Sequence, residues 1–133
     1  MKSDDLGKLI LRVSLGVLIL LHGLFKISNG VGGIAGMLSS HGLPGALAYL
    51  VLVGEVVAPV LVIVGLFTRL GALIIAINMV VAIVLAHMGQ IASLTQTGGW
   101  ALELQGMFLF SAIAVALMGA GRFSVAGVSG RYN

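Results

Sequence analysis

The sequence predicts an all-α, polytopic membrane protein: one bundle of four transmembrane helices with both termini in the cytoplasm. Hydrophobic residues make up 59% of the chain and charged residues only 8%, whereas soluble domains carry about 25% charged residues. The mean hydropathy is +1.19, and 133 residues have room for about four apolar spans of ~20 residues with short loops. We therefore expect a single transmembrane domain over residues 1–133 and no separate soluble domain.

The composition also excludes several classes of protein. The chain has no cysteine, so it has no disulfide, no thiolate metal site and no redox-active thiol. Phosphate-binding loops, nucleophile triads, metal motifs and nucleic-acid-binding patches are absent from the sequence. The N-terminal apolar run is too long for the hydrophobic region of a cleavable signal peptide, which predicts that the first span is retained.

The first helix is expected over about residues 6–28, in an apolar run that also carries Arg12, His22 and Lys26. A charged group in hydrocarbon costs several kcal/mol on insertion scales, so these side chains should face protein or water rather than lipid.

Two glycines indicate which face of this helix points into the bundle. At about 100° per residue, Arg12 and Lys26 fall on the same face as Gly16 and Gly23. A glycine lets the backbone of a neighbouring helix approach closely. We therefore expect this face to pack against another helix.

The second helix is expected over about residues 44–67, with Pro44 in its first turn and Glu55 and Pro59 in its interior. The preceding segment, residues 29–42, is rich in Gly and Ser and too weakly apolar for a full span. It is interpreted as a loop, a short interfacial helix or a re-entrant segment, since irregular backbone at membrane depth is tolerated only against protein or water.

The third helix is expected over about residues 68–88, with Thr68 as its N-cap and with Asn78 and His87 inside it. The fourth is expected over about residues 100–119.

The fourth helix opens with Trp100, which suits an interfacial anchor, and has Glu103 in its first turn. A polar loop precedes it and a Gly-rich tail closes the chain.

The basic residues predict the orientation of these helices, because cytoplasmic loops of membrane proteins carry an excess of Lys and Arg. With four spans, only Lys26 falls on the outer side. The others fall at the opposite end: Lys2, Lys8, Arg12, Arg69, Arg122 and Arg131. Both termini are therefore expected on the cytoplasmic side of a membrane that the chain crosses several times.

At a rise of 1.5 Å per residue, the four helices are expected to bring a polar cluster into the outer half of the bundle. Asn78 lies near mid-membrane and Arg12 toward the cytoplasm. The cluster itself comprises His22, Lys26, Glu55, His87 and Glu103. That is more ionisable chemistry than packing alone requires.

Each of these groups also has a structural interpretation. Lys26 reaches the headgroups if it snorkels, Glu103 suits the positive end of a helix, and His87 fits an ordinary interfacial position. Glu55 is the hardest to explain in this way, because a carboxylate near mid-membrane must be paired, protonated or hydrated.

The cluster permits definite chemistry. Histidine and a buried carboxylate exchange protons near neutral pH, and Lys26 or His22 would hydrogen-bond a quinone carbonyl. His22 and His87 would form a bis-histidine haem site only at matching depths, and their depths differ, so haem is disfavoured.

The order of these motifs over nearly the whole chain resembles the DoxX family of small bacterial membrane proteins. The first helix carries R-x3-G and HG-x2-K (Arg12, Gly16, His22, Gly23, Lys26), and G-x-P follows (Gly42, Pro44). Next come GE (Gly54, Glu55), G-L-x-T-R (Gly65, Leu66, Thr68, Arg69), Glu103 and a G-x-G-R-x-S tail (Gly119, Gly121, Arg122, Ser124). The family tail usually continues to an Asp two residues after the Ser, where this chain has Ala126.

The resemblance implies a four-helix inner-membrane protein associated with oxidoreductase systems. One relative is a subunit of a thiosulfate:quinone oxidoreductase, and others are linked to thiol and oxidative-stress defence. We therefore expect a membrane redox component that binds a quinone or a small sulfur or thiol substrate. It would use membrane or soluble oxidoreductase partners, and its small-residue faces leave room for a homo-oligomer.

In this interpretation Glu55, His22 and Lys26 carry the chemistry. Glu103, His87, Arg12 and Asn78 would support the bound group. No metal ligand set is expected.

Two other classes remain open. A proton-coupled or small-molecule transporter would use Glu55, although four-helix multidrug transporters of similar length carry their essential carboxylate in the first helix. A structural or assembly subunit would use the polar cluster only to hold helices together.

Overall fold

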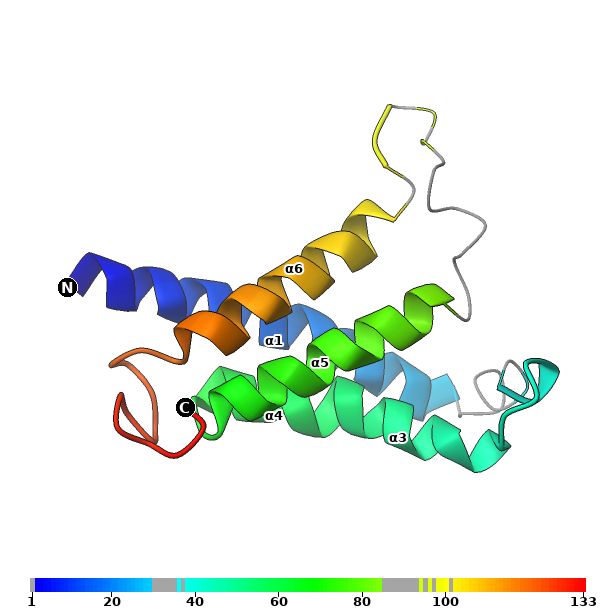
Figure 1. The fold of residues 1–133 in the computed structure, drawn as a ribbon, viewed down its shortest axis with the longest axis horizontal. Helices are drawn as coiled ribbons and strands as arrows, with labels where there is room; N and C mark the ends of the chain where they lie inside the picture. The colour runs from blue at the N-terminus through cyan, green and yellow to red at the C-terminus, as the bar shows by residue number, and fades with distance from the viewer. Residues whose placement is uncertain are drawn as a thin grey trace.

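The computed structural model describes residues 2–29, 36, 38–84, 94, 96, 98–100 and 102–133. In these ranges the regular elements are helices, and Leu94 and Trp100 form an isolated bridge. Figure 1 shows helices running lengthwise beside one another, with both chain ends at the same end of the bundle. The all-α class is thus confirmed over the described part of the chain.

Helix α1 spans Lys2–Asn29 and begins four residues before the expected start. Asp4 and Asp5 lie in its first turn, where negative charge stabilises the partial positive charge of a helix N-terminus. Within it, Ser3–Phe25 is a run of 23 residues with a mean hydropathy of 1.9, long and apolar enough to cross a membrane.

The expected second helix is divided into four pieces. A 3₁₀ turn, η1 (Gly45–Leu47), leads into α3 (Ala48–Leu52), then a π-helical turn, η2 (Val53–Val57), and then α4 (Ala58–Val64). The segment ends before the expected residue 67, because Gly65 adopts the left-handed conformation (φ 78°) that closes a helix.

Helices α5 (Thr68–Ala82) and α6 (Glu103–Met118) complete the bundle. The end expected for the third helix near residue 88, and most of the segment 29–42, lie outside the described residues.

The expected N-cap of α5 is wrong. Phe67, and not Thr68, occupies the N-cap position. It adopts the left-handed conformation, and its side chain makes no capping hydrogen bond. Instead, the Asn133 Oδ1 accepts hydrogen bonds from the backbone N of Thr68 (3.1 Å) and from its Oγ1 (2.7 Å). The cap is therefore supplied by a residue distant in sequence, which local spacing cannot reveal.

Helix α1 packs closely against the second segment, as its glycines predict. A Cβ placed on Gly16 would lie 3.0 Å from the carbonyl oxygen of Pro59, and one on Gly23 would collide with the carbonyl oxygen of Glu55. Around these contacts α1, α4, α5 and α6 share one core, which includes Leu15, Ile19, Ala58, Val62, Ala72, Ile75, Ala76, Phe108, Ala112 and Val115.

Arg12 is buried (1% exposed) and donates hydrogen bonds to four backbone carbonyls. Two belong to the last turn of α4: Nη1 lies 2.9 Å from the oxygen of Val62 and 2.6 Å from that of Ile63. The other two are in the C-terminal tail, where Nε donates to Ala120 (3.2 Å) and Nη2 to Phe123. Arg12 thus faces inward, as predicted, and joins three segments.

The remaining carbonyls at the end of α4 bond to the tail and to the turn. Val125 donates its N–H to Val64 (3.0 Å), and Ala126 donates to Gly65 (3.1 Å). The last carbonyls of a helix have no partner within it, so the tail completes the end of this helix. Ala126, where the family tail usually has Asp, contributes through its backbone.

Arg69 plays a matching role at the end of α6. Its Nη1 donates to the carbonyls of Ala116 (3.2 Å) and Leu117 (2.7 Å), and Nη2 to that of Met118 (3.3 Å). A cation is favourable there, because the C-terminus of a helix carries partial negative charge.

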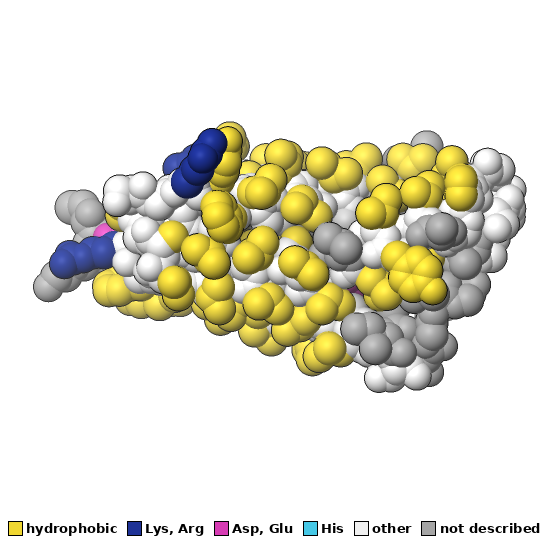
Figure 2. Space-filling model, turned by 90° about the horizontal axis from the view of Figure 1, so that it is seen from below, with side chains coloured by type: hydrophobic (Ala, Val, Ile, Leu, Met, Phe, Trp, Pro, Cys, Tyr) yellow, Lys and Arg dark blue, Asp and Glu magenta, His cyan; other side chains and the backbone are white. Residues whose placement is uncertain are grey.

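The surface of the bundle is largely apolar. Figure 2 shows hydrophobic side chains along most of one face and Lys and Arg gathered at one end. Examples of exposed large side chains, with at least half of their surface accessible, are Leu21, Phe25, Leu50, Ile77, Met107, Phe110 and Leu117. Apolar cover of this extent indicates contact with lipid or protein rather than water.

The Gly23 contact generates a stability prediction. Gly23→Ala should destabilise the protein by about 2 kcal/mol, because the added methyl group forces α1 away from the carbonyl of Glu55. Gly7→Ala is the matched control on the same helix, since a Cβ there meets nothing within 4 Å. Thermal unfolding in detergent, followed by circular dichroism, measures both, and equal midpoints would contradict the close packing.

The Arg12 contacts generate a second prediction. Arg12→Met should lower the free energy of unfolding by about 3–5 kcal/mol, since several buried carbonyls lose their donor at once. Arg131→Met is the control, because Arg131 is an exposed arginine whose guanidinium lies over the ring of Tyr132 (5.3 Å to its centroid). Chemical unfolding in mild detergent would show a large loss for the first variant only. A small loss for Arg12→Met would show that water or detergent replaces these bonds.

Candidate functional site

Glu55 lies in the π-helical turn η2 and is buried, with 3% of its surface exposed. Its Oε1 accepts a hydrogen bond from Nδ2 of Asn78 on α5, at 3.3 Å. Gly54 makes this contact sterically feasible: a Cβ there would lie 2.9 Å from both Cβ and Cγ of Asn78. The GE pair therefore combines a carboxylate with the space for its partner.

The local sequence explains the π turn. Pro59, in the first turn of α4, has no N–H and cannot donate to the carbonyl of Glu55 four residues earlier. Single π turns occur inside α-helices and are frequent at functional sites. Gly23 of α1 packs against the same carbonyl, so both α1 and α5 hold the turn in place.

A cavity of about 170 Å³ lies beside this carboxylate. Four segments of the bundle contribute to it: α1 with His22, η2 with Glu55, α5 with Met79 and Ala82, and α6. The described residues that line it are Ile19, His22, Glu55, Met79, Ala82, Leu104, Gln105 and Phe108. The structure thus brings together two of the predicted site residues, His22 and Glu55.

His22 is held in one orientation by two contacts. Its Nδ1 lies 2.9 Å from the carbonyl oxygen of Leu18, which can only accept, so Nδ1 carries the proton. The ring also meets the ring of Phe108 edge to face, with centroids 5.6 Å apart and an interplanar angle of 87°. Nε2 remains for a ligand, accepting a hydrogen bond from it when the imidazole is neutral and donating one when it is charged.

The other predicted residues lie elsewhere. Asn78 hydrogen-bonds to Glu55 but does not line this cavity. Arg12 lies nearer the other end of α1, where it binds the carbonyls of α4. Glu103 begins α6, and its carboxylate lies against Gly99. His87 and the side chain of Lys26 lie outside what the structure describes.

Sequence reasoning missed Gln105 and Phe108. Gln105 was detectable, because α6 is otherwise apolar apart from Glu103 and Ser111. Phe108, three residues later, falls on the same helix face, but nothing in the sequence separates it from the other apolar residues of α6.

Comparison with known proteins places the chain in a family. The model of the DoxX family matches residues 7–88. The chain belongs to the DoxX family. DoxX proteins are membrane-associated, and α1 of this one is long and apolar enough to span a membrane.

A curated relative from Bacillus subtilis (strain 168), named "Putative oxidoreductase CatD", is 37% identical over 83 residues. The aligned stretch covers 62% of this chain and 61% of the relative, about three fifths of its length. No solved structure matches the chain significantly.

The family match divides the site of this DoxX protein in an informative way. His22, Glu55 and Asn78 lie inside the matched region, whereas Gln105 and Phe108 of α6 lie beyond it. The carboxylate, its partner and the histidine therefore lie in the part of the chain that the family model covers.

The Glu55–Asn78 contact is testable by a double-mutant cycle. Glu55→Leu and Asn78→Leu should each destabilise this DoxX protein, and the double variant should be more stable than additivity predicts by about 1 kcal/mol. The measurement is the free energy of unfolding, in one detergent, of the wild type, the two single variants and the double variant. Pairing Glu55→Leu with Ser111→Ala is the control and should be additive. Additivity for both pairs would show that the 3.3 Å contact contributes nothing.

Proposed function

We propose that this chain is a redox component of the bacterial inner membrane, and that the cavity beside Glu55 binds the head group of a quinone. Membership of the DoxX family and the likeness to a protein named as an oxidoreductase support the redox assignment. The observation that carries the quinone assignment is the convergence of His22, Glu55 and Gln105 on one largely apolar cavity.

The proposed topology has four spans with cytoplasmic termini. Besides α1, three shorter apolar helical stretches run over Ala48–Val64, Thr68–Ala82 and Glu103–Met118. Arg69 and the tail containing Arg122 meet the start of α1 at one end, where the N–H of Arg122 donates to Oδ1 of Asp5 (3.2 Å). Basic residues gathered at one end favour the cytoplasmic side for that end.

The size and lining of the cavity suit a single ring. A closed apolar cavity of about 150 Å³ accepts benzene, and this one measures about 170 Å³. Ile19, Met79 and Phe108 provide apolar walls, and His22 and Gln105 provide polar atoms that can meet ring oxygens. The residues present therefore fit a monocyclic quinone head.

A bound quinone would supply two-electron, two-proton redox chemistry at this position. The Gln105 amide donates a hydrogen bond to one ring oxygen and Nε2 of His22 meets the other. Glu55 and His22 exchange the two protons with these oxygens, while Asn78 holds the carboxylate in position. Lys26, four residues after His22 in α1, is proposed to favour the bound head group through its positive charge. The two electrons come from a reduced sulfur or thiol compound or from a partner's redox centre.

An assembly subunit is the second candidate, and the Glu55–Asn78 hydrogen bond favours it. This bond joins η2 to α5 inside the bundle, and a polar contact between membrane helices stabilises them without any chemistry. The two functions predict different effects of Glu55→Gln. A glutamine still accepts the hydrogen bond from Asn78, so an assembly role would be kept. It cannot exchange protons, so a redox role would be lost.

Mass spectrometry of lipids extracted from the purified protein tests the quinone site. Wild-type protein should carry quinone enriched over bulk membrane lipid, and His22→Gln, Glu55→Gln and Lys26→Ala should each lower the bound quinone about fivefold, which corresponds to about 1 kcal/mol of binding free energy. His41→Gln is the matched histidine control, because His41 lies in the turn after the helical residues 38–40 and does not line the cavity. Wild-type protein with no more quinone than bulk lipid would overturn the proposal.

A further inference from the structure

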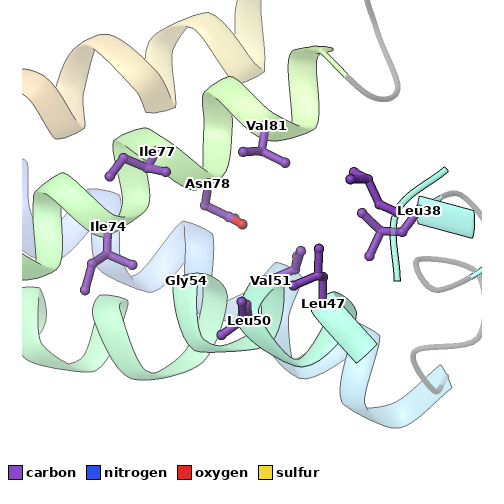
Figure 3. Close-up of a pocket in the computed structure, with 10 residues that line it drawn as sticks. Leu38, Leu47, Leu50, Val51, Gly54, Ile74, Ile77, Asn78 and Val81 are labelled. Atoms are coloured by element: carbon purple, nitrogen blue, oxygen red, sulfur yellow. The ribbon is translucent and has the colours of Figure 1, made fainter. Parts of the chain in front are cut away.

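A second, larger cavity borders the same hydrogen bond. It has a volume of about 470 Å³ and lies between α5 on one side and η1, α3 and η2 on the other. Figure 3 shows the Asn78 side chain of α5 pointing toward the space above Leu47, Leu50 and Val51, with Leu38 at one end. Ile77 and Val81 of α5 also line this cavity. His22, Gln105 and Phe108 do not line it.

The walls of this cavity select an aliphatic ligand. Among the residues that the structure describes, the walls consist of leucine, isoleucine and valine side chains together with Gly54 and Asn78, and none of these residues is aromatic or charged. At about 30 Å³ for each water-sized group, 470 Å³ accommodates a chain of roughly 15 carbon atoms. A flexible hydrocarbon chain therefore fits better than a planar ring system or a charged solute.

Asn78 adds one polar requirement. Its side chain is more than nine-tenths buried and points into the cavity (Figure 3). Because Nδ2 donates to the carboxylate of Glu55, the amide is oriented with its NH₂ group toward Glu55 and its Oδ1 away from it. An amide oxygen accepts hydrogen bonds, and this one faces the cavity, where it can accept from a ligand. The matching ligand carries an O–H group at the end of its chain.

We propose that this cavity binds a long-chain alcohol of the membrane, with its hydroxyl group donating to Oδ1 of Asn78 and its chain lying along the leucine, isoleucine and valine walls. Straight-chain and isoprenoid alcohols share this chemistry. The site is separate from the quinone cavity, and it is coupled to that cavity through Asn78. A ligand on Oδ1 fixes the amide in the orientation that presents Nδ2 to Glu55.

Photo-crosslinking of the full chain in detergent tests this site. The probe is a 16-carbon alcohol with a diazirine in mid-chain, and its methyl ether is the matched probe that lacks the donor. The alcohol should label peptides of α3 and α5 saturably and bind about fivefold more tightly than the ether, the value of one hydrogen bond. Asn78→Leu should abolish the difference between the two probes.

Two neighbouring valines supply the matched variants. Val81→Trp fills the cavity and should reduce labelling at least tenfold. Val80→Trp changes a residue on the same helix that is also exposed (47% against 38%) but does not line the cavity, and it should leave labelling unchanged. Competition with unlabelled hexadecanol and farnesol then shows whether straight or isoprenoid chains bind better, and saturable competition by either supports the site.

Labelling spread evenly over the exposed apolar residues of α1 and α6, or equal labelling of the two valine variants, would overturn the proposal. Each of the two proposals can fail without the other, although both sites contact the Glu55–Asn78 pair. Loss of quinone in Glu55→Gln does not depend on Val81, and a chain bound beside Val81 does not require a quinone at His22.

Discussion

The buried Arg12 guanidinium is the interaction on which the rest of this fold depends. Four of its five N–H groups bond to backbone carbonyls, two in the last turn of α4 and two in the tail. A charge inside an apolar bundle is costly unless it is fully hydrogen-bonded. The carbonyls at a helix C-terminus are likewise costly when buried without donors. The guanidinium and these carbonyls therefore satisfy each other, and their hydrogen bonds fix α1, α4 and the tail relative to one another.

With one end fixed in this way, the polar groups near the other end acquire defined positions. Gly23 presses on the carbonyl of Glu55, Pro59 removes the donor that a regular helix would supply, and the backbone relaxes into the π turn. The carboxylate is then directed toward α5, where Asn78 contacts it. Asn78 also faces the larger apolar cavity, so one amide joins two spaces of different chemistry.

Much of this arrangement could be predicted from local sequence. Apolar composition indicates helices, the spacing of Arg12 and Gly16 identifies the inward face, and Glu55 stands out as a carboxylate in an apolar run. The division of the second segment into 3₁₀, α and π pieces could not be predicted, because it results from α1 packing against Pro59 and Glu55. The Asn133 cap of α5 and the role of Phe108 depend on contacts between segments far apart in the chain, which spacing rules do not address.

The partners of Arg12 also determine when in its synthesis the protein can close. Ala120 and Phe123 lie 108 and 111 residues after Arg12, and ribosomes add about 5–20 residues each second. The first helix therefore waits for several seconds, with α4 available and the tail not yet made, before its arginine can be satisfied. During that interval the charge must stay near water or headgroups, since hydrocarbon cannot accommodate it. Synthesis of residues 120–123 is thus the step that allows the first helix to settle.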